Sequence, residues 1–294
     1  MTRSTAAKDV REPFVSVDWL RENLDAPDLV VIDGSYYLAT MKRDPEAEFL
    51  AGHIPGAVRF DIDTVKDHAN PLPHMLPDEA GFAEAVGAMG IGDDTRIVIY
   101  DGAGLYSAPR VWWMFTIFGA RDVRILDGGL PAWREAGGAI EEGPARARSK
   151  QSFTAKLHRD AVADLAAIET ALADPVVQVV DARSAERFRG EAPEPRAGLP
   201  NGHMPGSVSL PFGEIMENGR LKDEASIRDA LERHAIDPQR PVITSCGSGV
   251  SAAILTLAFH KIGHPPQALY DGSWTEWASR PDAPIGTGDP TTRR

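Results

Sequence analysis

Cys246 is the single cysteine of this sequence, and it stands where a nucleophile would be expected. It directly follows the strand-like run Val242 to Ser245 and opens the loop Cys-Gly-Ser-Gly-Val-Ser, after which residues 252–261 suit a helix. A strand, a glycine-containing loop and a helix N-terminus direct several main-chain N–H groups into one concavity, which binds anions and stabilises a thiolate. Gly247 and Gly249 let the backbone turn and leave the sulfur uncovered. The sequence therefore predicts a reactive thiol at Cys246.

Two other thiol chemistries and one structural role compete with this interpretation. A lone cysteine is often only a small buried hydrophobe. A cysteine phosphatase needs an arginine six positions after the nucleophile to hold the phosphoryl oxygens, and Ala252 occupies that position here. A thiol protease needs a histidine base near the thiol, which the sequence leaves open, although nothing local resembles a protease nucleophile turn. Phosphatase chemistry is disfavoured.

The elements around Cys246 occur twice in the chain. Four ordered blocks repeat at nearly constant offset, namely 30–33 with 177–181, 52–56 with 202–206, 97–102 with 241–247, and 126–133 with 270–277. Such a long period indicates a duplicated domain. The position that matches Cys246 is Asp101, so only the second copy can perform thiol chemistry. We expect a catalytic second domain and a supporting first domain.

Each copy alternates short apolar strands with helical stretches, which predicts an α/β fold with a mostly parallel sheet flanked by helices. Asp33 and Asp181 are expected to end buried strands. The predicted domains span residues 10–140 and 161–286, with a linker at 141–160 that has no apolar periodicity. Helices are predicted at 78–89, 108–118, 223–235 and 250–261.

Composition excludes several classes of protein. The chain has 294 residues and a formal net charge of −12, which argues against binding to nucleic acid or to anionic membranes. One cysteine excludes an internal disulfide, and the 8 histidines never show metal-ligand spacing, so neither a metal nor another cofactor is expected. The polar start of the chain and the short apolar stretch at 111–120 suggest no signal or membrane segment. We expect a cytoplasmic protein.

Several motifs resemble tandem-domain rhodanese-type sulfurtransferases, most of all their 3-mercaptopyruvate branch. The resemblance covers about residues 14–284, and the loop Cys-Gly-Ser-Gly-Val stands where that branch has its active-site loop. The thiosulfate branch typically carries basic residues after the cysteine, and Ser251 here replaces the commoner threonine. Further marks are Gly-His-Ile-Pro-Gly at 52–56, Ser-Ala-Pro-Arg-Val-Trp-Trp at 107–113, Arg-Phe-Arg-Gly at 187–190, Pro-Glu-Pro-Arg at 193–196 and Asp-Gly-Ser-Trp at 271–274.

The resemblance implies two rhodanese-like domains and a persulfide mechanism. The Cys246 thiolate would take sulfur from 3-mercaptopyruvate, release pyruvate and pass the outer sulfur to cyanide or to a thiol. Because the chain has no second cysteine, the acceptor must be external, such as thioredoxin or a small thiol. The alternatives are a thiosulfate:cyanide sulfurtransferase and a non-catalytic persulfide carrier. A monomer is expected.

The same resemblance assigns roles to individual residues. Arg187 and Arg196 would clamp the donor carboxylate, and Ser248 would stabilise the keto oxygen. His53, from the first domain, would orient Ser248, with Asp44 as the nearby acid. The loop residues that would contact the donor are Gly247, Gly249, Val250 and Ser251.

Structural explanations remain open for four of these residues. Arg187 can instead pair with Glu186, and Arg196 can be solvated. His203 occupies the repeat position of His53, so both histidines can simply support the same turn. Asp44 can cap a helix that begins at Pro45.

Overall fold

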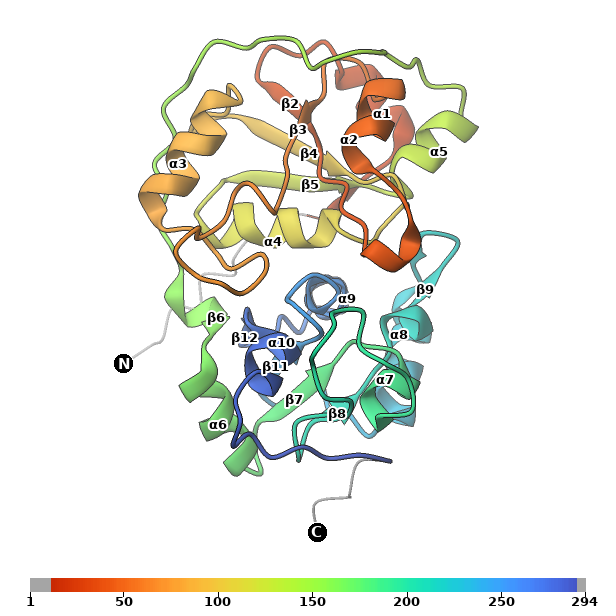
Figure 1. Cartoon of the computed structure of the whole chain (residues 1–294). Helices are drawn as coiled ribbons and strands as arrows, with labels where there is room; N and C mark the ends of the chain where they lie inside the picture. Colours follow the sequence, from red (N-terminus) through yellow and green to blue (C-terminus); the bar gives the residue numbers. More distant parts are fainter. Residues whose placement is uncertain (1–11, 290–294) are drawn as a thin grey trace, which may run out of the picture.

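The computed structural model describes residues 12–289 and contains two α/β domains stacked one on the other (Figure 1). Domain 1 carries a five-stranded sheet with the order β1-β5-β4-β2-β3, and domain 2 repeats it as β6-β12-β11-β7-β8, with parallel pairing throughout. The first sheet contains β1 (Phe14–Val15), β2 (Leu29–Asp33), β3 (Val58–Arg59), β4 (Arg96–Tyr100) and β5 (Asp122–Leu126). The second contains β6 (Val162–Ala163), β7 (Gln178–Asp181), β8 (Val208–Ser209), β11 (Val242–Ser245) and β12 (Ala268–Tyr270). The predicted duplication of an α/β fold is confirmed.

Helices lie on the faces of both sheets (Figure 1). Domain 1 has α1 (Val17–Asn23), η1 (Ala39–Met41), α2 (Pro45–Ala51), α3 (Glu79–Ala88), α4 (Ala108–Ile117) and α5 (Gly129–Glu135). Domain 2 has η2 (Arg159–Ala161), α6 (Leu165–Ala173), α7 (Ala185–Arg189), η3 (Phe212–Ile215), α8 (Glu224–Arg233), α9 (Ala252–Lys261) and α10 (Ser273–Ala278), with a hairpin of β9 (Met216–Glu217) and β10 (Arg220–Leu221). All four predicted helices are present.

Capping explains where the predicted helices begin. The Asp78 and Asp223 side chains accept hydrogen bonds from the main chain of the first turns of α3 and α8. The last predicted helix was expected from Val250, yet α9 begins at Ala252 because the preceding residues belong to the loop after β11. Asp33 and Asp181 end β2 and β7, as predicted.

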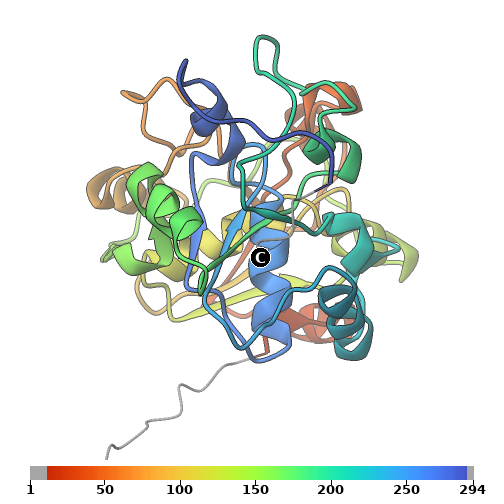
Figure 2. The same cartoon turned by 90° about the horizontal axis from the view of Figure 1, so that it is seen from below.

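The two domains meet through α4 and α9, which face each other across the middle of the molecule (Figure 1). Figure 2 looks along the stack from the domain 2 end, with α9 near the centre. Eight of the ten residues of α9 are buried, and nine of the ten in α4 are. Helices that are apolar on nearly every side belong in a core, so the seam between the domains is itself a packed core.

The segment that joins the domains runs over the outside of domain 1 (Figure 1). The Gln151 N–H donates to the Gly87 carbonyl and the Lys156 N–H to the Phe118 carbonyl, while the Phe153 ring is 7% exposed. The connection is therefore fixed along domain 1. No helix within residues 12–289 is long and apolar enough to cross a membrane. The polar start of the chain, residues 1–11, lies outside the described residues.

Candidate active site

Cys246 lies at the carboxyl end of β11, on the edge of the domain 2 sheet that faces domain 1, and is 1% exposed. The following loop turns at Gly249, whose φ is +76°. A Cβ at Gly249 would lie 2.8 Å from Arg110 Nη1 and 2.9 Å from the Asp271 carbonyl oxygen. Glycine is required there by both conformation and space.

The N-terminal end of α10 holds this loop in place. The Trp274 N–H donates to the Cys246 carbonyl at 2.9 Å, and the Thr275 N–H donates to the Gly247 carbonyl at 2.9 Å. The Ser273 hydroxyl oxygen accepts from the N–H groups of Cys246 at 3.1 Å and Gly249 at 3.2 Å, while the hydroxyl donates to the Tyr270 carbonyl. Ser273 is therefore the main support of the loop, a role that the sequence analysis did not assign to it.

Other N–H groups of the loop are not engaged. Within residues 12–289 no acceptor contacts the main-chain nitrogens of Gly247, Ser248, Val250 and Ser251. Domain 1 shows what such a loop does with an anion. There the Asp101 carboxylate accepts from the N–H groups of Ala103, Tyr106, Ser107 and Ala108. The corresponding domain 2 loop has a thiol instead of that internal carboxylate, and its amides are available to a bound anion.

The structure places Arg187 against the loop and Arg196 beside two residues of domain 1. A Cβ on Gly247 would lie 3.0 Å from Arg187 Nη2, so this guanidinium lies against the start of the loop. Its ion-pair partner is Glu194, at 2.5 Å, rather than Glu186. The Arg196 guanidinium lies 3.0 Å from His74 Nε2 and 3.5 Å from the Tyr36 hydroxyl.

His74 and Asp63, from the long domain 1 loop between β3 and α3, form the other side of the site. His74 is 2% exposed, and its Nδ1 lies 2.7 Å from Asp63 Oδ1. Because Arg196 can only donate, His74 Nε2 accepts and Nδ1 carries the proton toward Asp63. Burial lowers the His74 pKa below its ordinary 6.5, although Asp63 opposes the shift. His74 is therefore a neutral imidazole with a defined tautomer.

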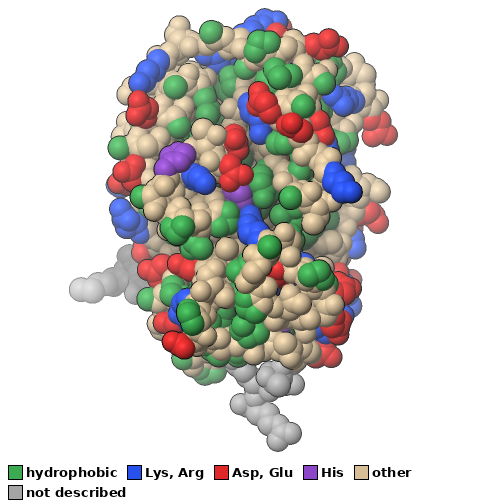
Figure 3. All heavy atoms as spheres, viewed as in Figure 1, with side chains coloured by type: hydrophobic (Ala, Val, Ile, Leu, Met, Phe, Trp, Pro, Cys, Tyr) green, Lys and Arg blue, Asp and Glu red, His purple; other side chains and the backbone are tan. Residues whose placement is uncertain are grey.

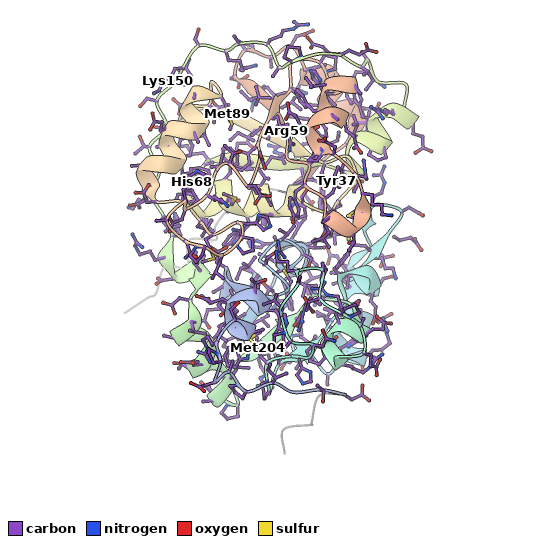
Figure 4. The ribbon with its side chains drawn as sticks, in the orientation of Figure 1. Tyr37, Arg59, His68, Met89, Lys150 and Met204 are labelled. Atoms are coloured by element: carbon purple, nitrogen blue, oxygen red, sulfur yellow. The ribbon has the colours of Figure 1, made fainter. Side chains whose placement is uncertain are left out.

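Two domain 1 tyrosines complete the site. Burial raises the pKa values of the Tyr36 and Tyr106 hydroxyls, and a negative charge on Cys246 adds to both shifts. Both phenols are thus neutral in the folded protein. In Figure 4, Tyr37 and His68 mark the two domain 1 loops nearest to domain 2. On the face in Figure 3, basic, acidic and histidine side chains gather near mid-height, where the domains meet.

The structure corrects the expected roles of His53 and Asp44. His53 Nδ1 contacts the Phe49 carbonyl at 2.9 Å, and its ring stacks on Phe49. His203 makes the same contacts with Phe188 in domain 2. His53 therefore supports a turn that both copies share, rather than orienting Ser248. Asp44 is exposed and caps α2 by accepting from the Glu46 and Ala47 N–H groups.

The residues that sequence reasoning missed had one visible signal. Asp63 and His74 lie in the segment between the Gly-His-Ile-Pro-Gly turn and α3, and this segment is longer than its domain 2 counterpart. An insertion in one copy of a repeat is a candidate for function. Ser273 had a similar signal, because Gly129 occupies its position in domain 1.

A buried thiol on an amide-lined loop, with arginines and a neutral histidine nearby, is an arrangement that suits nucleophilic attack by the thiol on an anionic substrate. Within residues 12–289 no group of three or more His, Cys, Asp or Glu side chains is arranged to hold a metal ion.

Comparison with known proteins gives the family. The Rhodanese-like domain model matches residues 16–136 and 164–280. The chain is 41% identical over 303 residues to Thiosulfate/3-mercaptopyruvate sulfurtransferase 1, mitochondrial, of Arabidopsis thaliana (96% of this chain, 80% of that protein). It is 40% identical over 273 residues to the 3-mercaptopyruvate sulfurtransferase of Escherichia coli K12 (92% and 97%). The crystal structure of Escherichia coli SseA, described as a 3-mercaptopyruvate sulfotransferase, superimposes with a TM-score of 0.82 at 38% identity (89% and 98%). The chain belongs to the tandem-domain rhodanese-type sulfurtransferases.

Proposed function

We propose that this sulfurtransferase moves sulfur from 3-mercaptopyruvate to an acceptor thiol or cyanide through a persulfide on Cys246, and that pyruvate is released. The observation that carries the proposal is the group of Cys246, the unengaged loop amides, Arg187 and Arg196 at one seam. This group offers a nucleophile, a site for developing negative charge, and cations for a carboxylate.

Donor binding uses both arginines. The donor carboxylate lies between Arg187 and Arg196, which places the donor sulfur over Cys246. The keto oxygen is directed toward Ser248, whose side chain is buried at the same loop and makes no side-chain hydrogen bond within the described chain. Gly247, Gly249, Val250 and Ser251 form the wall behind it, and they lack side-chain charge.

The first step makes one bond and breaks one. The Cys246 thiolate attacks the donor sulfur, an S–S bond forms, and the C–S bond breaks. The electron pair of that bond passes into the enolate of pyruvate, whose oxygen is stabilised by Ser248 and the loop amides. Arg196 leaves His74 Nε2 when it engages the donor carboxylate, and the freed Nε2 then accepts the proton of the donor thiol. The His74 imidazolium passes this proton to the methylene carbon, which gives pyruvate and leaves the Cys246 persulfide as its anion.

The second step needs an acceptor from outside. Within the full sequence Cys246 is the only cysteine, so the outer sulfur of the persulfide is taken by an external thiolate, such as that of thioredoxin or a small thiol, or by cyanide. The free thiolate is restored. No cofactor takes part in either step.

The second candidate is transfer from thiosulfate to cyanide, which one relative's name includes beside 3-mercaptopyruvate. The loop after Cys246 has no Lys or Arg through Ser251, so a dianionic donor would depend on main-chain amides there. A third possibility is a persulfide carrier with little turnover.

Steady-state rates with 3-mercaptopyruvate and with thiosulfate, each with cyanide as acceptor, test these proposals. A higher kcat/KM for 3-mercaptopyruvate is expected. Preference for thiosulfate contradicts the donor assignment, and negligible turnover with both favours the carrier. Mass spectrometry should detect one added sulfur on the peptide that contains Cys246 after exposure to the donor, and none in Cys246→Ser.

We also propose a monomer in the cytoplasm. The site is assembled from two domains of one chain, and a catalytic thiol needs a reducing compartment. Light scattering and cell fractionation test the two statements. A relative of similar sequence is named as mitochondrial, so fractionation should include organelles where the source cell has them.

A further inference from the structure

We propose that Glu194 determines the charge of the donor that the site accepts, by neutralising Arg187 so that a monoanion is preferred to a dianion. This inference rests on the proposed function, because it concerns the donor of the same cysteine. It assigns the preference to a residue outside the loop that follows Cys246.

Glu194 lies in the loop after α7, and its side chain is 3% exposed. One carboxylate oxygen, Oε1, accepts from Arg183 Nη1 at 2.8 Å and from Arg187 Nε at 3.2 Å. The other, Oε2, accepts from Arg187 Nη2 at 2.5 Å. Arg187 thus commits two of its three nitrogens to Glu194. Nη1, which contacts no acceptor in the described chain, and the second hydrogen of Nη2 are available to a donor.

Of the two other arginines near the site, Arg183 has an ion pair and Arg196 has none within the described chain. Arg183 and Asp181 are both 0% exposed and lie 2.7 Å apart. Arg196 is beside neutral His74, which in turn contacts the Asp63 carboxylate. Arg183 and Arg187 are therefore matched by Asp181 and Glu194, whereas Arg196 contacts no carboxylate in the described chain and is left for a single carboxylate of the donor.

A site in which Arg196, of these three arginines, lacks an ion pair favours a donor with one negative charge. Buried charges are screened less than exposed ones, so a second negative charge on the donor meets no uncompensated cation near Arg187. 3-Mercaptopyruvate carries one carboxylate charge, whereas thiosulfate carries two. Loss of the Glu194 charge releases the Arg187 cation and improves the site for the dianion more than for the monoanion.

Glu194→Gln is the variant that isolates this charge, since it keeps the shape and one acceptor oxygen. The matched control is Glu191→Gln in the same loop, because Glu191 also pairs with an arginine, Arg189, but at an exposed position. The measured quantity is kcat/KM for thiosulfate divided by kcat/KM for 3-mercaptopyruvate. We expect this ratio to increase on the order of tenfold in Glu194→Gln, as for one unit charge several ångströms from the donor. It should remain unchanged in Glu191→Gln, and the increase should shrink as ionic strength rises.

A purely structural role for Glu194 predicts a different result. If Glu194→Gln only disorders Arg187, kcat/KM falls by the same factor for both donors and the ratio of the two values does not change. That result would overturn the proposal. Glu194→Asp keeps the charge and is expected to keep the ratio, so an equal shift in that variant also overturns it. If Glu194→Gln does not fold, Glu194→Ala gives the same test, because its cavity admits water between the guanidinium groups.

A binding experiment distinguishes a failure of this proposal from a failure of the proposed function. Calorimetric titration of Cys246→Ser with sodium pyruvate and with sodium sulfate compares a monoanion and a dianion without turnover. Addition of Glu194→Gln should strengthen sulfate binding relative to pyruvate binding by a similar factor. If the native enzyme uses neither sulfur donor but this shift is seen, the proposed function fails and the role of Glu194 stands. If the enzyme is active and the relative affinity does not change, the role of Glu194 fails.

Discussion

Arg110 of domain 1 and Asp271 of domain 2 form an ion pair of 2.6 Å in which the Arg110 side chain is fully buried. The same guanidinium donates to the His74 carbonyl at 2.7 Å and to the Gly249 carbonyl at 3.4 Å, and it lies over the Trp113 ring. Asp271 in turn accepts from the Leu76 N–H. The buried Arg110 cation therefore connects the His74 loop with the Cys246 loop, so the same ion pair holds both halves of the site.

Replacement of Arg110 should cost both stability and activity. Arg110→Met leaves the Asp271 carboxylate buried without its partner, which is expected to lower the free energy of unfolding by about 3–5 kcal/mol. Urea denaturation measures this loss, and kcat should fall because His74 and Gly249 lose a common donor. Arg110→Met combined with Asp271→Leu should recover part of the stability but not the activity. Full recovery of activity would show that the Arg110–Asp271 ion pair does not position the two loops of the site.

Ser273 offers a separate test of loop support. Its φ is +51°, a conformation that glycine adopts at the matching Gly129. Ser273→Gly removes the backbone strain and the hydroxyl, whereas Ser273→Ala removes only the hydroxyl and keeps the strain. We expect Ser273→Gly to be more stable than Ser273→Ala by about 1 kcal/mol. Both should lose turnover, because the Cys246 and Gly249 N–H groups lose their acceptor. Normal kcat in either variant contradicts the supporting role.

If Arg187 and Arg196 bind the donor carboxylate, replacing either one should lower the activity with 3-mercaptopyruvate. Arg187→Ala and Arg196→Ala should each lower kcat/KM for 3-mercaptopyruvate by about 10- to 100-fold, equivalent to a charge-assisted contact of roughly 1.5–3 kcal/mol. Arg189→Ala is the control, since Arg189 pairs with exposed Glu191. Unchanged kinetics in both clamp variants would remove these arginines from the donor site.

The local sequence pattern was sufficient to predict the part of the site that is continuous in the chain. The loop from Cys246 to Ser251 follows its strand directly, so strand, loop and helix could be read in order, and the repeat identified Asp101 as its counterpart. The same pattern predicted the ends of β2 and β7, because a polar residue after a buried apolar run marks the sheet edge.

The domain 1 half of the site could not be read this way. His53 and His74 are both buried histidines of domain 1, and only the packing of α4 on α9 decides which faces the loop. The predicted role of His53 was catalytic, and the repeat left a structural role open beside it. His53 and His203 make matching contacts, which favours the structural role. Glu194 was hidden for a similar reason, since Arg187 had a closer acidic neighbour in sequence at Glu186.

The pH dependence of stability should report the His74 environment. Burial lowers the His74 pKa below 6.5, so the folded protein keeps a neutral imidazole at pH values where the unfolded chain already binds a proton. Stability is therefore expected to fall as pH falls below about 6.5, by at most about 1.4 kcal/mol per pH unit for this one group. Asp63 does not interfere in this range, because its bond to His74 lowers its pKa below 3.8 and its contribution is lost only in stronger acid.

His74→Gln separates this contribution from that of His203, whose pKa is also lowered by burial and which remains in the variant. Urea denaturation of both proteins at pH 7.5 and 5.5 should show a smaller loss of stability in the variant. Activity gives a second readout, since protonation of Nε2 places a cation against Arg196 and removes the proton acceptor. The native kcat/KM for 3-mercaptopyruvate should therefore fall on the acid side, and the acid limb should disappear from the residual activity of His74→Gln. Equal pH dependence of stability in the two proteins would mean that His74 is protonated in the folded state, and the assigned tautomer would be wrong.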